Sequence, residues 1–199
     1  MPDHPEQPTR RRLTDILGRD GLQELFSLLS LDEPVEVAAL ARASGQDATR
    51  LQAELRSQPG TDWDEDGRLV GFGLTLRETP HRFVVDGRQL FTWCAMDTLI
   101  FPVVLGVTAS VTSSCAATGV PISFRVSPNA VEDLRPTTAV VSEARPAGEV
   151  RDLRSQVCDQ GHFYASADAA SRWSADHLGG RVLLIEDALV ACRAFFDPA

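Results

Sequence analysis

The side chains of this chain whose types could do chemistry include four cysteines, four histidines and the carboxylates near them. The most apolar segment, "FTWCAMDTLIFPVVLG" at residues 91–106, holds a thiol, Cys94, and a carboxylate, Asp97, three residues apart. If this segment is helical, the two groups share one face, flanked by Trp93 and Ile100. Such flanks would raise the pKa of the carboxyl, which could then hold a proton at neutral pH and donate it.

A structural interpretation fits the same residues. Cys94 can be a small buried apolar residue. Asp97 can cap a helix or pair with an arginine, which would offset the cost of placing a carboxylate among apolar side chains. The physical chemistry of the two residues leaves the structural and the catalytic interpretations evenly balanced.

The remaining candidates are scattered. Cys115, Cys158 and Cys192 form no CxxC pair, so a structural zinc site and a disulfide framework are both disfavoured. His162 follows Cys158 by four residues and could form a Cys/His dyad, although a histidine beside "FYAS" is more often a hydrogen-bonding residue at a strand end. The usual nucleotide-binding, metalloprotease and serine-hydrolase motifs are absent from the sequence.

The composition is that of a globular protein with an acidic surface. The chain has 199 residues, 43% of them hydrophobic and 24% charged, with a formal net charge of −9. An acidic surface disfavours nucleic acid and anionic membranes as partners. All 19 basic residues are arginines, which excludes lysine chemistry. No secretory signal and no apolar run of membrane-spanning length is evident, so we expect a cytoplasmic protein.

The elements that would position the candidate residues begin with a winged-helix-like unit. Residues 1–12 are expected to be a disordered tail, and residues 13–80 to form a small helical domain. Two short helices near 36–43 and 47–56, with Asp47 as N-cap, follow a first helix, and a hairpin turning at Asp66-Gly67 completes the unit. Residues 1–80 carry 9 arginines against 15 acidic residues, a net of −6, so we expect a structural module rather than a DNA-binding one.

Residues 81–199 alternate between strand and helix patterns, which predicts an α+β domain with a mixed or antiparallel sheet and flanking helices. A hairpin is expected to turn at Asp86-Gly87. A helix is expected over 168–178, with Ser166 as its N-cap and Gly179-Gly180 as its stop, and a second helix over 187–196. Residues 128–136 are expected to be a short helix or turn. Strands are expected at 109–117, 121–127, 137–144, 161–166 and 181–187.

Three blocks of this sequence, taken together, resemble a known family. "WCAMDTLIFPVVLG", "SSCAATGVPISFRVSP" and "VCDQGHFYAS…W…H" occur in order with similar spacing, and the chain resembles the organomercurial (alkylmercury) lyase family over roughly residues 20–197. The resemblance implies that two cysteines and one aspartate carry the reaction, matching Cys94, Cys158 and Asp97. It implies a structural role for Cys115. Cys192 has no counterpart in the family and is interpreted as a buried residue of the last helix.

The implied reaction is cleavage of a carbon–mercury bond by protonolysis. Mercury is a soft metal that prefers thiolates. Asp97 would help to deprotonate a thiol, Cys94 and Cys158 would bind R–Hg⁺, and Asp97 would then protonate the departing carbon, leaving Hg(II) on the two sulfurs. The enzyme would need no organic cofactor and no resident metal. Its implied partners are a small organomercury substrate, soluble thiols, and a mercuric reductase that would receive Hg(II).

Other interpretations remain open beside this one. The same cysteines could serve a thiol-based mercury sensor or a soft-metal carrier without catalysis. Asp159, directly after Cys158, would oppose thiolate formation if it pointed inward. Cys192 could capture mercury unproductively.

Overall fold

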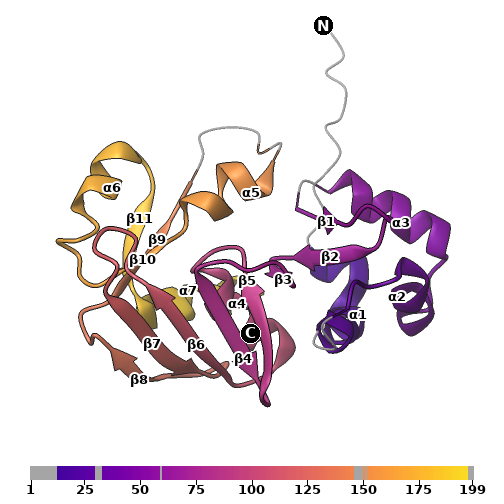
Figure 1. Cartoon of the computed structure of the whole chain (residues 1–199), viewed down its shortest axis with the longest axis horizontal. Helices are drawn as coiled ribbons and strands as arrows, with labels where there is room; N and C mark the ends of the chain where they lie inside the picture. The colour runs from indigo at the N-terminus through magenta and orange to yellow at the C-terminus, as the bar shows by residue number, and fades with distance from the viewer. Residues whose placement is uncertain (1–12, 30–32, 59, 146–149, 151, 197–199) are drawn as a thin grey trace, which may run out of the picture.

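The computed structural model describes residues 13–29, 33–58, 60–145, 150 and 152–196, so the expected tail at 1–12 lies outside the described residues. Within them the chain has the predicted α+β architecture. A helical front unit stands beside a long antiparallel sheet, and further helices and a smaller sheet complete the fold (Figure 1). No helix among the residues that the structure describes is long and apolar enough to cross a membrane.

The front unit consists of α1 (Leu13–Leu29), α2 (Val37–Ser44) and α3 (Ala48–Ser57). Leu22, Leu25 and Leu29, which recur at helical spacing in α1, are buried. Asp47 is the predicted N-cap, because its side chain accepts a hydrogen bond from the backbone N–H of Arg50 at 2.8 Å. The turn between α2 and α3 closes through Gly45 in the left-handed region, at φ 65°.

The main sheet begins inside the front unit and continues into the rest of the protein. Its strands lie in the order β1-β2-β3-β5-β4-β6-β7-β8, and neighbouring strands are antiparallel. The first five are β1 (Asp62–Trp63), β2 (Leu69–Phe72), β3 (Leu74–Thr75), β4 (His81–Val85) and β5 (Arg88–Thr92). The β4–β5 hairpin turns at Asp86 and Gly87, both at positive φ, as its Asp-Gly signal predicts. The domain boundary at residue 80 stays a prediction, and β3 pairs with β5 across it.

The second half of the main sheet shows the alternation of a half-buried sheet. β6 (Ala109–Ser114) and β7 (Pro121–Val126) alternate inward apolar and outward polar side chains. A smaller sheet, in the order β10-β9-β11, is made of β9 (Val140–Glu143), β10 (Phe163–Tyr164) and β11 (Arg181–Leu184), also antiparallel. The predicted sheet is therefore antiparallel rather than mixed among the described residues.

Helices cover the sheets and carry the segments of greatest interest. They are α4 (Asp97–Leu105), α5 (Leu153–Gln156), the 3₁₀ turn η1 (Cys158–Gln160), α6 (Ser171–Asp176) and α7 (Ile185–Phe196). Helix α4 is apolar nearly all round because it packs between the main sheet and α7, on one face of that sheet (Figure 1). Pro102 lies inside α4, in its last turn. The helix continues to Leu105 and has Gly106 as its C-cap.

Three local predictions were wrong. Residues 128–136 contain an edge strand, β8 (Val131–Arg135), not a helix or turn, and its mostly exposed charged side chains are typical of protected sheet edges. Helix α6 has Ala170 as its N-cap, while the hydroxyl of Ser166 accepts a hydrogen bond from the N–H of Ala169 in the preceding turn. The same helix ends at Asp176, before the two glycines.

Candidate active site

Cys94 and Asp97 lie where β5 gives way to α4. Cys94 belongs to the turn that precedes the helix, and Asp97 is the first residue of α4, so the prediction that both lie on one helix face was wrong. The turn instead joins them directly, because a carboxylate oxygen of Asp97 (Oδ2) accepts a hydrogen bond from the Cys94 N–H at 3.1 Å. The hydroxyl of Thr92 donates to the carbonyl of Cys94 at 2.9 Å. Both contacts fix the backbone of Cys94 just before the helix.

Cys158 reaches the same place from a distant part of the chain. It opens η1, and the turn is tied to the Cys94 segment by a hydrogen bond from the N–H of Ala95 to the carbonyl of Gly161 at 3.1 Å. The other side of η1 is held by α6. The indole N–H of Trp173 donates to the carbonyl of Gln160 at 3.0 Å, and His177 hydrogen-bonds the side chain of Gln160 at 3.0 Å.

The three candidate side chains meet. One sulfur each from Cys94 and Cys158 and one carboxylate oxygen of Asp97 all lie within 4.8 Å of one another. The two cysteines are buried and Asp97 is partly exposed. Zinc–thiolate bonds are roughly 2.3 Å long, so two sulfurs that share one zinc ion lie at most about 4.6 Å apart. Sulfurs that lie within 4.8 Å of each other are therefore close enough to share one soft metal ion. The geometry therefore suits a two-thiolate site with a carboxyl beside it.

Proton affinities in the cluster follow from its surroundings. Burial raises the pKa of the Asp97 carboxyl to about 6, against the opposing effect of hydrogen bonds from Cys94. The hydrogen bond with Cys158, burial and the nearby Asp97 charge together raise the pKa of the Cys94 thiol well above its ordinary value. In the absence of a metal, the Cys94 thiol therefore keeps its proton, and Asp97 changes protonation close to neutral pH.

Two glycines allow the close approach of the segments. A Cβ at Gly161 would lie 3.1 Å from the Cβ of Cys94 and 3.5 Å from its sulfur. A Cβ at Gly73 would lie 2.8 Å from the ring of Phe101 in α4, and Gly73 also has φ 74°. Sequence reasoning missed both residues. Gly161 lies inside the "VCDQGHFYAS" block, but nothing local indicates that its neighbour is Cys94.

Other candidates from the sequence lie outside this cluster. Asp159 is 53% exposed and its carboxylate lies 3.8 Å from the Arg154 guanidinium, so it does not point inward at the thiols. His162 is not a member of the cluster, and burial lowers its pKa. Its backbone N–H donates to Ser142 at 2.9 Å, a structural contact.

The two remaining cysteines are both buried. Cys115 directly follows β6, and its backbone pairs with Val120. Cys192 lies in α7, where burial, reinforced by the charges of Glu143 and Asp97, raises the pKa of its thiol to about 12. Neither belongs to the three-residue cluster among the described residues. The predicted location of Cys192 in the last helix agrees with the structure.

Comparisons with known proteins agree over nearly the whole chain. A family model described as "Alkylmercury lyase" matches residues 74–197, and one described as "Helix-turn-helix domain of alkylmercury lyase" matches residues 19–73. The chain is 45% identical over 164 residues to an alkylmercury lyase of Pseudomonas putida, covering 82% of this chain and 77% of the relative. It is 44% identical, over the same share of this chain and 76% of the relative, to one of Streptomyces lividans.

The fold also has a solved counterpart. The structure entitled "Crystal structure of the mercury-bound form of MerB2" superposes with a TM-score of 0.72 at 24% identity, covering 89% of this chain and 90% of the other. This likeness shows that the two proteins share their fold.

Proposed function

This chain belongs to the alkylmercury lyase family, and from that premise we propose that Cys94, Cys158 and Asp97 carry its reaction. The protein is an enzyme that acts on small organomercury compounds and cleaves their carbon–mercury bond by protonolysis, giving a hydrocarbon and Hg(II). The observation that supports the residue assignment is the meeting of two buried sulfurs and one carboxylate oxygen within 4.8 Å.

The first step is capture of the substrate R–Hg–X, where X is a displaceable ligand. One thiol forms a sulfur–mercury bond and releases its proton with X. The second thiol then binds mercury and passes its proton to the Asp97 carboxylate, which can accept it because burial raises the pKa of Asp97 to about 6. Mercury is now bound to carbon and two thiolates, and their electron density weakens the carbon–mercury bond.

The second step is proton delivery. The Asp97 carboxylic acid donates its proton to the carbon as the carbon–mercury bond breaks, so that R–H leaves and Hg(II) remains on Cys94 and Cys158. Asp97 returns to the carboxylate form, and the balance is one substrate and two thiols giving R–H, HX and a mercury dithiolate. A carboxyl that acts as base and then as acid needs a pKa near the working pH, which the partly buried position of Asp97 provides.

The partners of this reaction follow from the product. Hg(II) bound by two thiolates leaves only by exchange with other thiols. We propose small-molecule thiols as the first acceptors and a mercuric reductase as a protein acceptor. The mechanism needs reduced cysteines, and all four cysteines are free in the structure, so we propose a cytoplasmic location.

A mercury sensor that binds DNA through its front unit is the main alternative. Of the two arginines on α3, Arg56 stacks on the ring of Trp63 at 4.3 Å and is engaged within the protein. The unit is acidic overall, whereas a helix that reads DNA normally carries a basic surface. A mobility-shift assay at low salt tests this alternative directly, since a tight and salt-sensitive DNA complex would support the sensor.

Hydrocarbon release is the deciding experiment for catalysis. Methylmercury or phenylmercury is incubated with the enzyme and excess thiol, and methane or benzene is measured by gas chromatography. Each of Cys94→Ala, Cys158→Ala and Asp97→Ala is expected to lower the rate by at least about 100-fold. Cys192→Ala serves as the matched control, because it removes a buried thiol outside the cluster.

The same assay separates the lyase from a carrier. A carrier would bind mercury stoichiometrically, release no hydrocarbon and tolerate Asp97→Ala. Turnover that survives Cys158→Ala unchanged would contradict the two-thiolate mechanism.

A further inference from the structure

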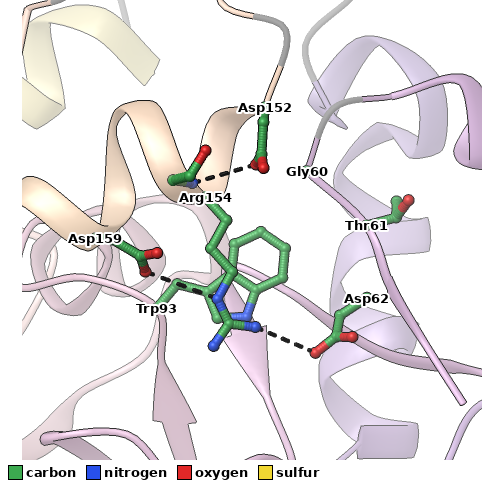
Figure 2. A pocket seen from close by; sticks show the side chains of 8 residues that line it. Gly60, Thr61, Asp62, Trp93, Asp152, Arg154 and Asp159 are labelled. Carbon is green, nitrogen blue, oxygen red and sulfur yellow. Dashed lines mark hydrogen bonds and ion pairs between the residues drawn. The ribbon is translucent and has the colours of Figure 1, made fainter.

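A polar pocket of about 200 Å³ opens beside the cysteine cluster. It lies where β1 of the front unit faces α5 and η1 (Figure 2). Its walls include Thr61, Asp62, Trp93, Asp152, Arg154 and Asp159. None of the three cluster residues lines it, so the pocket is a separate feature from the mercury-binding cluster.

The pocket is adjacent to both proposed mercury ligands. Trp93 directly precedes Cys94, and Asp159 directly follows Cys158. Consecutive Cα atoms are about 3.8 Å apart, so the pocket wall is one residue away from each thiol. A molecule held in this pocket therefore contacts residues that are the chain neighbours of both thiols.

Trp93 leaves a hydrogen-bond donor unused. Its side chain is 5% exposed, and its indole nitrogen, Nε1, is the one buried side-chain polar atom without a hydrogen-bond partner among the described residues. Figure 2 shows the indole extending into the space between Asp159 and Asp62, under the Arg154 side chain. Buried polar groups normally have partners, so an orphaned donor in a pocket wall points to a ligand that accepts from it.

Arg154 spans the pocket, and its guanidinium donates one long hydrogen bond there, to the carboxylate of Asp62. Its guanidinium lies 5.4 Å from the centre of the Trp93 ring, 3.4 Å from Asp62 and 3.8 Å from Asp159. Asp62 has a closer partner in Arg77, at 2.8 Å. The guanidinium can therefore turn toward a ligand at little cost.

The charge of the wall favours one class of ligand. Three carboxylates, Asp62, Asp152 and Asp159, and one guanidinium, that of Arg154, line the pocket, and Arg77 pairs with Asp62 from outside the lining, so the carboxylates still outnumber the guanidiniums. An anionic molecule is repelled by this wall, whereas an ammonium group is attracted. A carboxylate carried by the same molecule could still accept hydrogen bonds from Arg154 and from Trp93 Nε1.

We propose that this pocket binds the thiol that removes Hg(II), and that it selects thiols carrying an amino group and no net negative charge. The proposal rests on the proposed function, since it needs Hg(II) on Cys94 and Cys158. The exchange is balanced without a redox step. Each incoming thiol forms one sulfur–mercury bond, one cysteine–mercury bond breaks, and the proton of the incoming thiol ends on the released cysteine.

The test starts from protein loaded with Hg(II) from mercuric chloride, so that carbon–mercury cleavage is not required. Release is followed as mercury remaining with the protein after rapid desalting. Three thiols are compared at equal thiolate concentration: 2-aminoethanethiol, 2-mercaptoethanol and mercaptoacetate. We expect the release rate to saturate with increasing 2-aminoethanethiol. At low salt it should be about 10-fold higher than with mercaptoacetate, and this difference should become smaller as added salt screens the charges of the pocket wall.

Variants connect the preference to the pocket. Asp159→Asn removes one carboxylate and is expected to reduce the preference by about 3-fold, since a partly exposed charge contributes modestly. Trp93→Phe keeps a ring and removes the orphaned donor. With the free amino acid cysteine as a fourth thiol, whose carboxylate can accept from that donor, this variant is expected to raise the half-saturating thiol concentration. Asp86→Asn makes the same charge change at the β4–β5 turn, which does not line the pocket, and should leave the preference unchanged.

The proposal is overturned if the release rate rises linearly with the concentration of each thiol and is equal for the cationic, neutral and anionic thiols. Such a result describes simple collisional exchange. An equal loss of preference in Asp159→Asn and Asp86→Asn also overturns it, since only overall charge would then matter. Failure of the proposed function gives a different result. In that case hydrocarbon release is absent from organomercury substrates, whatever the behaviour of the Hg(II)-loaded protein.

Discussion

The backbone N–H of Ala95 donates a hydrogen bond to the carbonyl of Gly161 at 3.1 Å. Each residue lies within a few positions of one of the two sulfurs, so this single bond sets the register between the segment that carries Cys94 and the one that carries Cys158. The spacing of the proposed mercury ligands is thus built from backbone contacts and exists before metal arrives.

The close packing at Gly161 is open to a direct test. Its φ of −93° is accessible to any residue, so Gly161→Ala adds only a methyl group, which would lie 3.1 Å from the Cβ of Cys94. We expect the two segments to separate by a few tenths of an ångström. The value of kcat/KM for phenylmercury should fall roughly 10-fold, because the rate depends strongly on the positions of the reacting groups. Steady-state kinetics together with thermal unfolding checks this. Unchanged kinetics in a folded variant would show that the approach is not needed.

The pH dependence of turnover follows from Asp97. The carboxylate must accept a thiol proton, and burial raises its pKa to about 6, so below that pH it is already protonated in the free enzyme. We expect kcat/KM to fall about 10-fold per pH unit below roughly pH 6 and to level off above it. A pH–rate profile between pH 5 and 8 measures this, with the folded fraction recorded at each pH. A flat profile over that range would argue against Asp97 as the base.

Asp97 also makes a prediction about stability. Because its pKa is raised in the folded state, the folded protein binds this proton more tightly than the unfolded chain does. Ionisation of Asp97 therefore lowers the free energy of unfolding. This loss is absent below about pH 4, grows between pH 4 and pH 6, and is constant above pH 6. Asp97→Asn can still accept the hydrogen bond from Cys94, and should raise the unfolding free energy at pH 7.5 by about 1–2 kcal/mol after allowance for partial exposure.

Urea unfolding at pH 7.5 and pH 4.5 checks this gain, which should be clearly smaller at the lower pH. Asp86→Asn is the control, since asparagine suits the positive φ of that turn and the site is not involved. An Asp97→Asn variant that is less stable than the parent at pH 7.5 would mean that the carboxylate stabilises the fold. Activity should be lost in either case.

Cys115 and Cys192 are expected to behave as structural residues. Cys115→Ala and Cys192→Ala each leave a small cavity in a buried region, which should cost about 1–2 kcal/mol in unfolding free energy while leaving the kcat of the folded enzyme nearly unchanged. Chemical denaturation and hydrocarbon release measure the two effects separately. Loss of activity in Cys115→Ala at full stability would instead make that thiol a mercury ligand.

Local patterns in the sequence predicted most elements. The leucines of α1, the Asp47 cap and the Asp86-Gly87 turn each use neighbours within a few residues, and the structure confirms them. Edge strand β8 was missed because its exposed charges resemble those of a loop, and its pairing with β7 depends on a distant strand.

The site was less predictable than the fold. Cys94 and Asp97 stood out because they are polar groups in an apolar segment, yet their spacing could not decide between a structural and a catalytic role. Cys158 was identified through family resemblance alone, since no pattern indicates which distant thiol folds back. Gly161 and the Trp173–Gln160 contact depend on packing between separate segments, so they needed coordinates.

The main sheet passes without a break from β1 and β2 of the front unit to β8, and Val35, before α2, forms a bridge to Leu69 within it. The front unit therefore shares backbone hydrogen bonds with the strands that lead to Cys94 and cannot swing away as a hinged module. The protein should lose its structure in a single cooperative transition. Damage to the small helices would then inactivate the enzyme by depleting the folded population, without touching a mercury ligand.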